Sequence, residues 1–168
     1  MGTGKSAVGR QLADLLGWRF FDTDKLIEQE TKTSIAQIFA DKGEAFFREQ
    51  EKQVIARVSK ERNVVIATGG GAMVNKENVA CLRENSDIIC LTATPAIILE
   101  RVRSNRNRPL LQGDNPLVKI RTLLAARAEA YAQADVTIDT SRLDVQGVVK
   151  TILERLTNRR NATTCSSE

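Results

Sequence analysis

The sequence contains no histidine among its 168 residues, which removes the commonest general base and the commonest metal ligand of proteins. Any acid–base chemistry must therefore use carboxylates, lysine or cysteine. Aromatic residues make up only 4% of the chain, too few for a surface on which nucleobases stack. Cys81, Cys90 and Cys165 lack the spacing of a metal site or a disulfide framework, and we expect the first two to be core thiols.

The sequence also lacks an apolar run long enough to span a bilayer, and its first residues lack the apolar region of a secretory signal peptide. We therefore expect a cytoplasmic protein without a membrane partner. The net charge of +4 allows nucleic-acid binding, but the arginines are scattered through periodic segments. A protein that handles phosphates and carboxylates explains this charge better. Salt-sensitive retention on DNA would support the alternative.

The length is that of one domain, which we assign to residues 1–156. Short apolar segments predict strands, and segments with helical periodicity lie between them. This alternation predicts an α/β fold with a parallel sheet. Residues 157–168 are polar and aperiodic, and we expect them to be a disordered tail. The predicted strands lie at residues 19–22, 64–67, 87–91 and 135–139.

The most specific motif is Gly2-Thr3-Gly4-Lys5-Ser6, which precedes a helix with apolar residues at helical spacing. Backbone N–H groups at a helix N-terminus bind anions, so the motif predicts a di- or triphosphate site. Lys5 would reach the β- and γ-phosphates, and the Ser6 hydroxyl would bind Mg²⁺. A glycine-rich turn without function is the alternative, and the Gly-Lys-Ser order argues against it.

The motif is partial, because the signature G-x-x-x-x-G-K-[ST] would place its first glycine ahead of Met1. The strand that normally leads into such a loop is also missing from the sequence. We expect the natural protein to begin upstream of Met1, with residues that supply this strand. A folded structure of this chain should then show either a partner segment in that place or a sheet without its middle strand.

Two further motifs follow predicted strands. Asp22-Thr23-Asp24 offers two carboxylates at the sheet edge that faces ligands, one for Mg²⁺ and the other to accept a hydroxyl proton or orient the acceptor. Capping of the next helix by Asp22 or Thr23 is the alternative. Thr68-Gly69-Gly70-Gly71 would let a substrate approach the backbone and expose N–H donors, unless it is only a loose surface turn.

Two arginines invite a functional interpretation. Arg127 shares the apolar stripe of Ile120 and Tyr131, and an inward arginine must be paired. It predicts a fork that grips a carboxylate, although the side chain could instead reach solvent. Arg48 follows Phe46-Phe47 and allows the same interpretation, with a solvated helix charge as the alternative.

The segment Arg106-Asn107-Arg108-Pro109-Leu110-Leu111 is a basic loop ahead of a proline-capped helix. Its charge suits a lid that closes on the transferred phosphoryl group, at about residues 105–117. A solvated charge run is the alternative.

With these motifs in this order, the chain resembles the shikimate kinase family from Gly2 to about Leu156. The resemblance rests on the phosphate loop, on Asp22-Thr23-Asp24 and on the run Gly69-Gly70-Gly71. It also rests on Ser34-Ile35-Ala36 through Ile38-Phe39, Gly43-Glu44 with Phe47-Arg48 and Glu51, and Arg108-Pro109-Leu110-Leu111.

The resemblance implies a P-loop, nucleoside-monophosphate-kinase-like fold with three α/β/α layers. Its parallel sheet would have five strands in the order 2-3-1-4-5, with the first strand missing from this sequence. A substrate-binding region would span about residues 23–60. The implied activity is transfer of the γ-phosphate of ATP to the 3-hydroxyl of shikimate, giving 3-phosphoshikimate and ADP on the route to chorismate. The implied cofactor is Mg²⁺, and the implied state is a monomer.

The resemblance also implies roles for individual residues. Ser6 and Asp22 would hold the metal, and Asp24 would be the base, assisted by Lys5 and Arg108. ATP would be bound by Gly2, Thr3, Gly4, Lys5, Ser6, Ala7, Arg101, Arg108 and Arg142. Shikimate would be bound by Asp24, Arg48, Gly69, Gly70, Gly71 and Arg127.

Two other functions remain open at this point. Another small-molecule kinase of the same fold, such as a gluconate or nucleoside-monophosphate kinase, would share the phosphate loop. Arg48 and Arg127 argue against it, because a nucleobase has no carboxylate to be gripped. An assay with different acceptors distinguishes the two kinases. A non-catalytic nucleotide-binding module would bind nucleotide without shikimate-dependent ADP release. The intact Lys5, Ser6, Asp22 and Asp24 argue against such decay.

Overall fold

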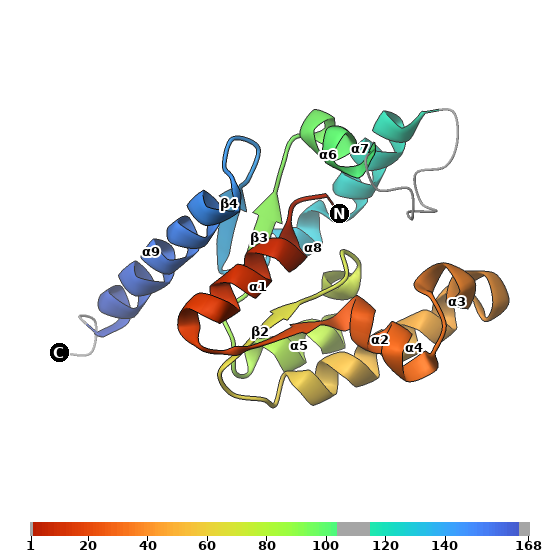
Figure 1. Ribbon diagram of the computed structural model, residues 1–168, viewed down its shortest axis with the longest axis horizontal. Helices are drawn as coiled ribbons and strands as arrows, with labels where there is room; N and C mark the ends of the chain where they lie inside the picture. The colour runs from red at the N-terminus through yellow and green to blue at the C-terminus, as the bar shows by residue number, and fades with distance from the viewer. Residues whose placement is uncertain (1, 104–114, 165–168) are drawn as a thin grey trace.

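The computed structural model of the protein describes residues 2–103 and 115–164 (Figure 1). Within these residues, strands alternate with helices as the sequence predicts. The strands are β1 (Arg19–Asp22), β2 (Val64–Ala67), β3 (Ile89–Thr92) and β4 (Val136–Asp139). The helices are α1 (Lys5–Leu16), α2 (Thr23–Thr31), α3 (Ile35–Asp41), α4 (Gly43–Val58), the 3₁₀ turn η1 (Ala72–Val74), α5 (Lys76–Arg83), α6 (Pro95–Arg103), α7 (Pro116–Ala126), α8 (Ala128–Tyr131) and α9 (Val145–Thr164).

The described strands form two parallel pairs instead of one continuous sheet. β1 pairs with β2, with Phe20 opposite Val65. β3 pairs with β4, with Cys90 opposite Thr137. β2 and β3 do not pair with each other, so each presents one edge without a strand partner in this part of the chain.

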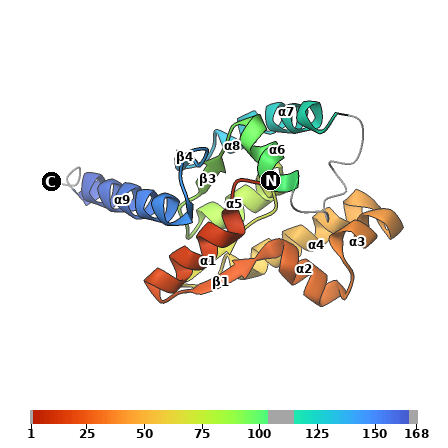
Figure 2. The same cartoon turned by 45° about the horizontal axis from the view of Figure 1, so that its top comes forward.

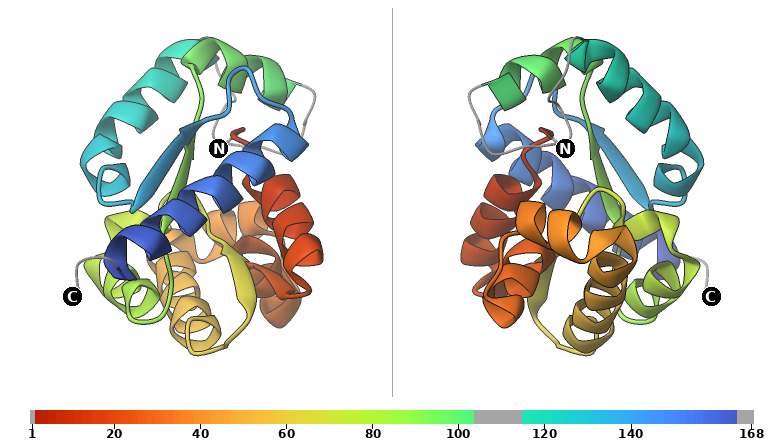
Figure 3. Two further views of the ribbon diagram at one scale, coloured as in Figure 1. Left: turned by 90° about the vertical axis from the view of Figure 1, so that its left-hand side faces the viewer. Right: turned by 90° about the vertical axis from the view of Figure 1, so that its right-hand side faces the viewer.

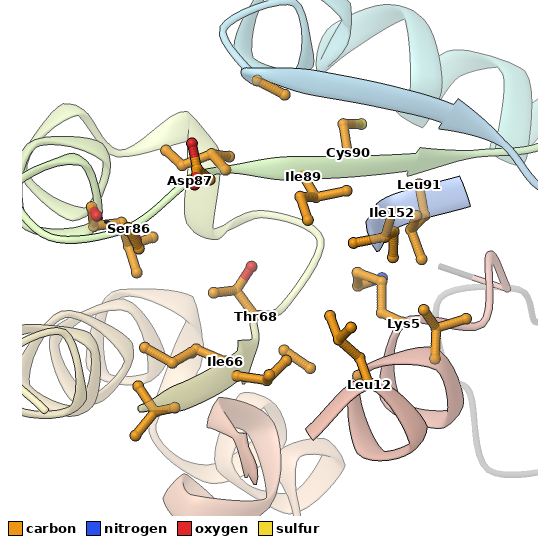
Figure 4. Close-up of a pocket in the computed structure, with 18 of the residues that line it drawn as sticks. Lys5, Leu12, Ile66, Thr68, Ser86, Asp87, Ile89, Cys90, Leu91 and Ile152 are labelled. Atoms are coloured by element: carbon orange, nitrogen blue, oxygen red, sulfur yellow. Dashed lines mark hydrogen bonds between the residues drawn. The ribbon is translucent and has the colours of Figure 1, made fainter. Parts of the chain in front are cut away.

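A cavity of about 710 Å³ separates the two pairs. It is lined by both facing strands, by Leu12 of α1 and by Ile152 of α9 (Figure 4). The expectation of a sheet without its middle strand is therefore confirmed, and the gap lies between the strands that flank the first strand in the implied order. The start of the natural protein upstream of Met1 stays a prediction.

Helices cover both faces of the strand pairs, which gives three layers (Figure 3). On one face α1 packs with α9, and Val8 and Leu12 contact Val148, Val149 and Ile152 above β4. On the other face α4 packs with α5 over β2. The fold therefore matches the predicted α/β/α architecture, because adjacent strand residues alternate between the two helical layers.

Helices flank the start of the chain on two sides. Figures 1 and 2 show α2 and α3 on one side of the chain's start and α6 and α7 on the other. The helical spacing of five residues predicts a single inward face, and the same five are the buried residues of α4: Phe47, Glu51, Val54, Ile55 and Val58. Residues 104–114, with Arg106 and Arg108, lie outside the described residues.

Several helix starts follow from local capping. The Ser34 hydroxyl accepts a hydrogen bond from Gln37 N, as the predicted capping box requires. Asn115 caps α7 in the same way, ahead of Pro116 at the first helical position. Asp144 caps α9 by accepting from Gly147 N at 2.8 Å.

Three expectations need correction. α9 continues to Thr164, so the prediction of disorder after residue 156 is wrong for residues 157–164, because a polar segment can extend a packed helix into solvent. Leu15 is 64% exposed and does not share the buried stripe of α1. The helix after Asn115 breaks at Arg127 into α7 and α8 instead of running unbroken to Tyr131.

None of the described helices is both long enough and apolar enough to cross a membrane.

Candidate functional site

The backbone conformation of the phosphate loop sets the start of helix α1. Gly4 has a φ of 86°, a left-handed conformation that glycine adopts without strain, and it stands at the N-cap of α1. Gly4 O accepts a hydrogen bond from Val8 N at 2.9 Å, which starts the helix. The first turn of α1 therefore presents its backbone N–H groups, together with Lys5 and Ser6, as an anion site.

Ser6 and Asp22 lie side by side, although they are remote in the sequence. The Ser6 hydroxyl donates a hydrogen bond of 2.6 Å to Asp22 Oδ2. Asp22 Oδ1 accepts from Lys25 N at 3.3 Å, so the carboxylate also caps α2. The structure is therefore compatible both with a metal-binding role of Asp22 and with its role as a helix cap. The described residues hold no cluster of three or more His, Cys, Asp or Glu side chains.

A hydroxyl and a carboxylate oxygen in contact fit Mg²⁺, which prefers oxygen ligands and takes few of them from the protein when phosphates supply others. The residues present therefore fit the metal that the family resemblance implies.

The glycine run after β2 lies against Asp24. Gly69 N donates a hydrogen bond of 3.2 Å to Oγ1 of the buried Thr23, which ties the run to the start of α2. A β-carbon built on Gly69 would lie 2.8 Å from Asp24 Oδ1 and 2.8 Å from Glu51 Oε1. No side chain fits there, so glycine is required by the close approach of two carboxylates.

Arg48 lies at the other end of the glycine run. Its guanidinium donates to Glu44 Oε1 from Nε at 3.1 Å and from Nη2 at 2.9 Å, and from Nη1 to Glu51 Oε2 at 2.8 Å. A β-carbon on Gly71 would lie 2.7 Å from Arg48 Nη2. The Arg48 side chain is only partly exposed, so it is not the fully solvated charge that was the alternative.

Glu51 joins these groups from the inward face of α4, where it is 0% exposed. Burial raises the pKa of the Glu51 carboxyl, the hydrogen bond and charge of Arg48 oppose that rise, and the charge of Asp24 adds to it. The charge of Arg127 lowers the same pKa. The structure therefore brings Asp24, Arg48 and the glycine run together around one buried acid, whereas Arg127 acts on that acid through its charge alone.

Arg101 and Arg142 lie at the carboxyl end of β4. Arg101 donates from Nη1 to Thr140 Oγ1 at 2.9 Å and from Nη2 to Thr140 O at 2.7 Å. The Thr140 hydroxyl lies 3.5 Å from Thr3 O of the phosphate loop. Hydrogen bonds from Ser141 lower the pKa of Asp139, and the charges of Arg142 and Arg101 lower it further. Arg101 is thus linked to the phosphate loop through Thr140, and Arg142 lies near Asp139 at the end of β4.

The large cavity between the strand pairs is not the predicted substrate site. Figure 4 shows Ile66, Ile89 and Leu91 on its walls, with the Lys5 side chain pointing into it from α1. At the carboxyl end of β2, the cavity reaches Gly69 and Gly70. An apolar space between two parallel strand edges has the shape and chemistry of a strand position, and polar residues such as Thr68 and Asp87 lie at its two ends.

The sequence analysis missed three residues of this region as site residues. Glu51 could have been noticed, because an acid on an otherwise apolar helix face needs a cation nearby. Thr23 was considered only as a cap, yet its hydroxyl holds Gly69. Tyr131 was assigned to an apolar stripe, yet its hydroxyl donates to Gly70 O at 2.7 Å. No local signal shows the partner of a hydroxyl that lies so far away in the sequence.

Comparison with known proteins agrees with this geometry. The family model described as SKI, shikimate kinase, matches residues 1–157. A shikimate kinase of Symbiobacterium thermophilum is 47% identical over 162 residues, which cover 95% of this chain and 93% of that protein. One of Moorella thermoacetica is 46% identical over 156 residues, which cover 93% and 90%.

Solved structures give the same result. Shikimate kinase from Acinetobacter baumannii in complex with shikimate superposes with a TM-score of 0.90 at 37% identity, over 95% of this chain and 89% of that chain. A gluconokinase from Sinorhizobium meliloti reaches a TM-score of 0.60 at 16% identity, over 100% and 93%, which shows a shared fold alone. With its phosphate loop, paired aspartates and arginine-lined glycine run in this arrangement, the chain belongs to the shikimate kinase family.

Proposed function

We propose that the protein transfers the γ-phosphate of ATP to the 3-hydroxyl of shikimate, which releases ADP and 3-phosphoshikimate. One observation carries the proposal: Asp24 and Arg48 lie against the glycine run, next to a phosphate loop, and the charge of Arg127 acts on the same buried acid. A carboxylate acceptor with several hydroxyls needs such a mixture of cations and an acid. A solved relative with 37% identity holds shikimate.

The nucleotide end of the site binds the phosphates. Backbone N–H groups of residues 2–7 and the Lys5 ammonium would hold the β- and γ-phosphates. Ser6 and Asp22 would hold Mg²⁺, which neutralises phosphate charge when bound. Arg101 and Arg142 would lie near the adenine, because both flank the carboxyl end of β4.

The acceptor end would orient shikimate by its carboxylate. Arg48 is held by three hydrogen bonds that it donates to Glu44 and Glu51, which fix the plane of its guanidinium. Its remaining N–H donors and those of Arg127 would grip the carboxylate, with Gly69, Gly70 and Gly71 as the adjacent wall. The rigid fork fixes which hydroxyl faces the phosphates.

Asp24 is the proposed base. Its carboxylate lies beside Gly69 and the buried Glu51, at the carboxyl end of the strands. It would accept the hydroxyl proton as the oxygen bonds to the γ-phosphorus, while Lys5 stabilises the charge on the departing ADP. Arg108, outside the described residues, is the proposed lid cation that completes this stabilisation.

We also propose a cytoplasmic monomer that binds small molecules and neither nucleic acid nor membranes. The scattered arginines and the low aromatic content support this proposal. Sedimentation of the purified protein tests the monomer.

The decisive experiment measures ADP release with ATP, Mg²⁺ and one of three acceptors. We expect release with shikimate and only background with gluconate or a nucleoside monophosphate. Equal release with either of the other acceptors would make the protein a different kinase of this fold. ATP binding without any shikimate-dependent release would favour the non-catalytic nucleotide-binding module.

A further inference from the structure

The Tyr131 hydroxyl makes a contact that the proposed roles do not use. It donates a hydrogen bond of 2.7 Å to Gly70 O, in a partly buried position. Tyr131 ends α8, which leads into β4, whereas Gly70 follows β2. The bond therefore links elements that belong to the two separate strand pairs, at the carboxyl end of the gap between them.

The glycine run is held from the opposite side by the charged cluster. Gly69 lies against Asp24 and Glu51, and Gly71 lies against Arg48, at distances that leave no room for a side chain. Gly70, between them, is the residue that Tyr131 holds. The backbone of the run is therefore contacted by side chains from α2 and α4 and is hydrogen-bonded by one from α8.

Tyr131 also belongs to the same short helix as Arg127. Tyr131 N donates to Arg127 O at 2.9 Å, and Arg127 is the residue at which α7 ends and α8 begins. Both side chains line a small cavity with Ile98, Ile120 and Leu124. A tyrosine anchored to Gly70 thus fixes the position of the helical turn that carries Arg127.

We infer that Tyr131 is a positioning residue for the acceptor. Its hydroxyl sets the separation between the glycine run and Arg127, two groups that would contact the same bound carboxylate. The inference rests on the proposed function, because it assigns Tyr131 to the shikimate end of the site and not to the nucleotide end.

The test compares Tyr131→Phe with the parent chain. Phenylalanine keeps the ring packing and removes only the hydroxyl. We expect the Kd for shikimate, measured by titration calorimetry, to rise about threefold to tenfold, the size of one hydrogen bond. The Kd for ADP with Mg²⁺ should stay within about twofold, and the thermal midpoint within a few degrees, because a bond with a purely structural role would lower stability without separating the two ligands.

A double-mutant cycle sharpens the test. If Tyr131 acts through Arg127, then Tyr131→Phe should cost clearly less in shikimate affinity when Arg127→Lys is already present. Strict additivity, or unchanged shikimate affinity of Tyr131→Phe in the parent background, overturns the inference. A parent chain that binds no shikimate overturns the proposed function and this inference together, so the two failures are distinguishable.

Discussion

The three acids near the glycine run and the phosphate loop, Asp22, Asp24 and Glu51, differ in burial and in hydrogen bonding. Glu51 is fully buried and joined to Arg48, whereas Asp24 is half-buried at the end of the glycine run. Asp22 has its two oxygens engaged by Ser6 and by Lys25 N. We propose Asp24 as the base because it lies at the glycine run, beside Gly69.

Replacing the proposed base tests this assignment. We expect Asp24→Asn to lower kcat about 10²–10⁴-fold, the usual effect of losing a positioned general base. Nucleotide affinity should barely change, because Asp24 is not part of the phosphate loop. Steady-state kinetics with a separate ADP titration measure both. A kcat within a few-fold of the parent value would remove Asp24 from the chemistry.

The arginine fork is tested by a substitution that keeps its charge. We expect Arg127→Lys to weaken shikimate binding by roughly 1.5–3 kcal/mol, because lysine cannot make the bidentate contact. ATP affinity should change much less. Equilibrium titrations of the two ligands provide the comparison. Unchanged shikimate affinity would mean that Arg127 faces solvent.

The buried acid gives a pH dependence whose sign follows from its pKa. The pKa of Glu51 is raised above its ordinary value of 4.5, mainly by burial, so the folded state binds this proton more tightly than the unfolded chain. The contribution of Glu51 to stability is therefore full at low pH and falls as pH rises from about 4.5 through the raised pKa. Glu51→Gln carries no such proton.

We expect the free energy of unfolding of the parent, minus that of Glu51→Gln, to decrease across this pH window. Urea unfolding of both proteins at matched pH values measures the difference, and all other groups cancel in it. A constant difference, or one that increases with pH, would contradict a raised pKa.

At the scale of elements, helix caps and inward stripes decide where the site residues lie. α4 places Arg48 and Glu51 on neighbouring positions one turn apart, which makes their contact a local consequence of helix geometry. α9 starts at a capped position and packs on α1, the helix that carries the phosphate loop. Loss of a cap should therefore weaken the fold more than it changes the chemistry.

We expect Asp144→Ala to lower the free energy of unfolding by about 0.5–2 kcal/mol, because Gly147 N loses its acceptor. Affinities for both substrates should stay near the parent values. Asp144→Asn, which keeps an oxygen acceptor, is the matched control and should cost less. Equal losses for alanine and asparagine would mean that charge near the helix start, and not the hydrogen bond, stabilises α9.

At the scale of the whole molecule, the dominant feature is the gap of about 710 Å³ between β2 and β3. Two unpaired strand edges and apolar walls face it, which favours aggregation. A strand in that place would bury about four or five apolar side chains at about 1.5–3 kcal/mol each. That sum is comparable with the stability of a whole domain, about 5–15 kcal/mol.

We therefore predict that an apolar, strand-forming extension ahead of Met1, with the signature glycine two residues before Met1, stabilises the chain by several kcal/mol. An extension of equal length made of Gly, Ser and Asp is the control, since it cannot fill an apolar gap. Urea midpoints and amide exchange of β2 and β3 measure the effect. Equal midpoints and equal exchange for the two extensions would show that the gap does not accept a strand.

The sequence by itself determined most of the elements and the chemistry of the site. Strand and helix periodicity, the caps at Ser34 and Asp144, and the inward face of α4 are local properties, which the structure confirms. The glycine-lysine-serine motif likewise carries its phosphate chemistry in adjacent residues. The missing strand could also be predicted, because the motif lacks the first glycine of the phosphate-loop signature, and that glycine directly follows the strand.

Only the tertiary structure decided which remote groups touch. Ser6 meets Asp22, Thr23 holds Gly69, and the Tyr131 hydroxyl reaches Gly70 across the gap. These contacts depend on how helices cross the strands and on single side-chain rotamers, and neither leaves a periodic trace in the sequence. The break at Arg127 and the extension of α9 beyond residue 156 are likewise visible only in the structure.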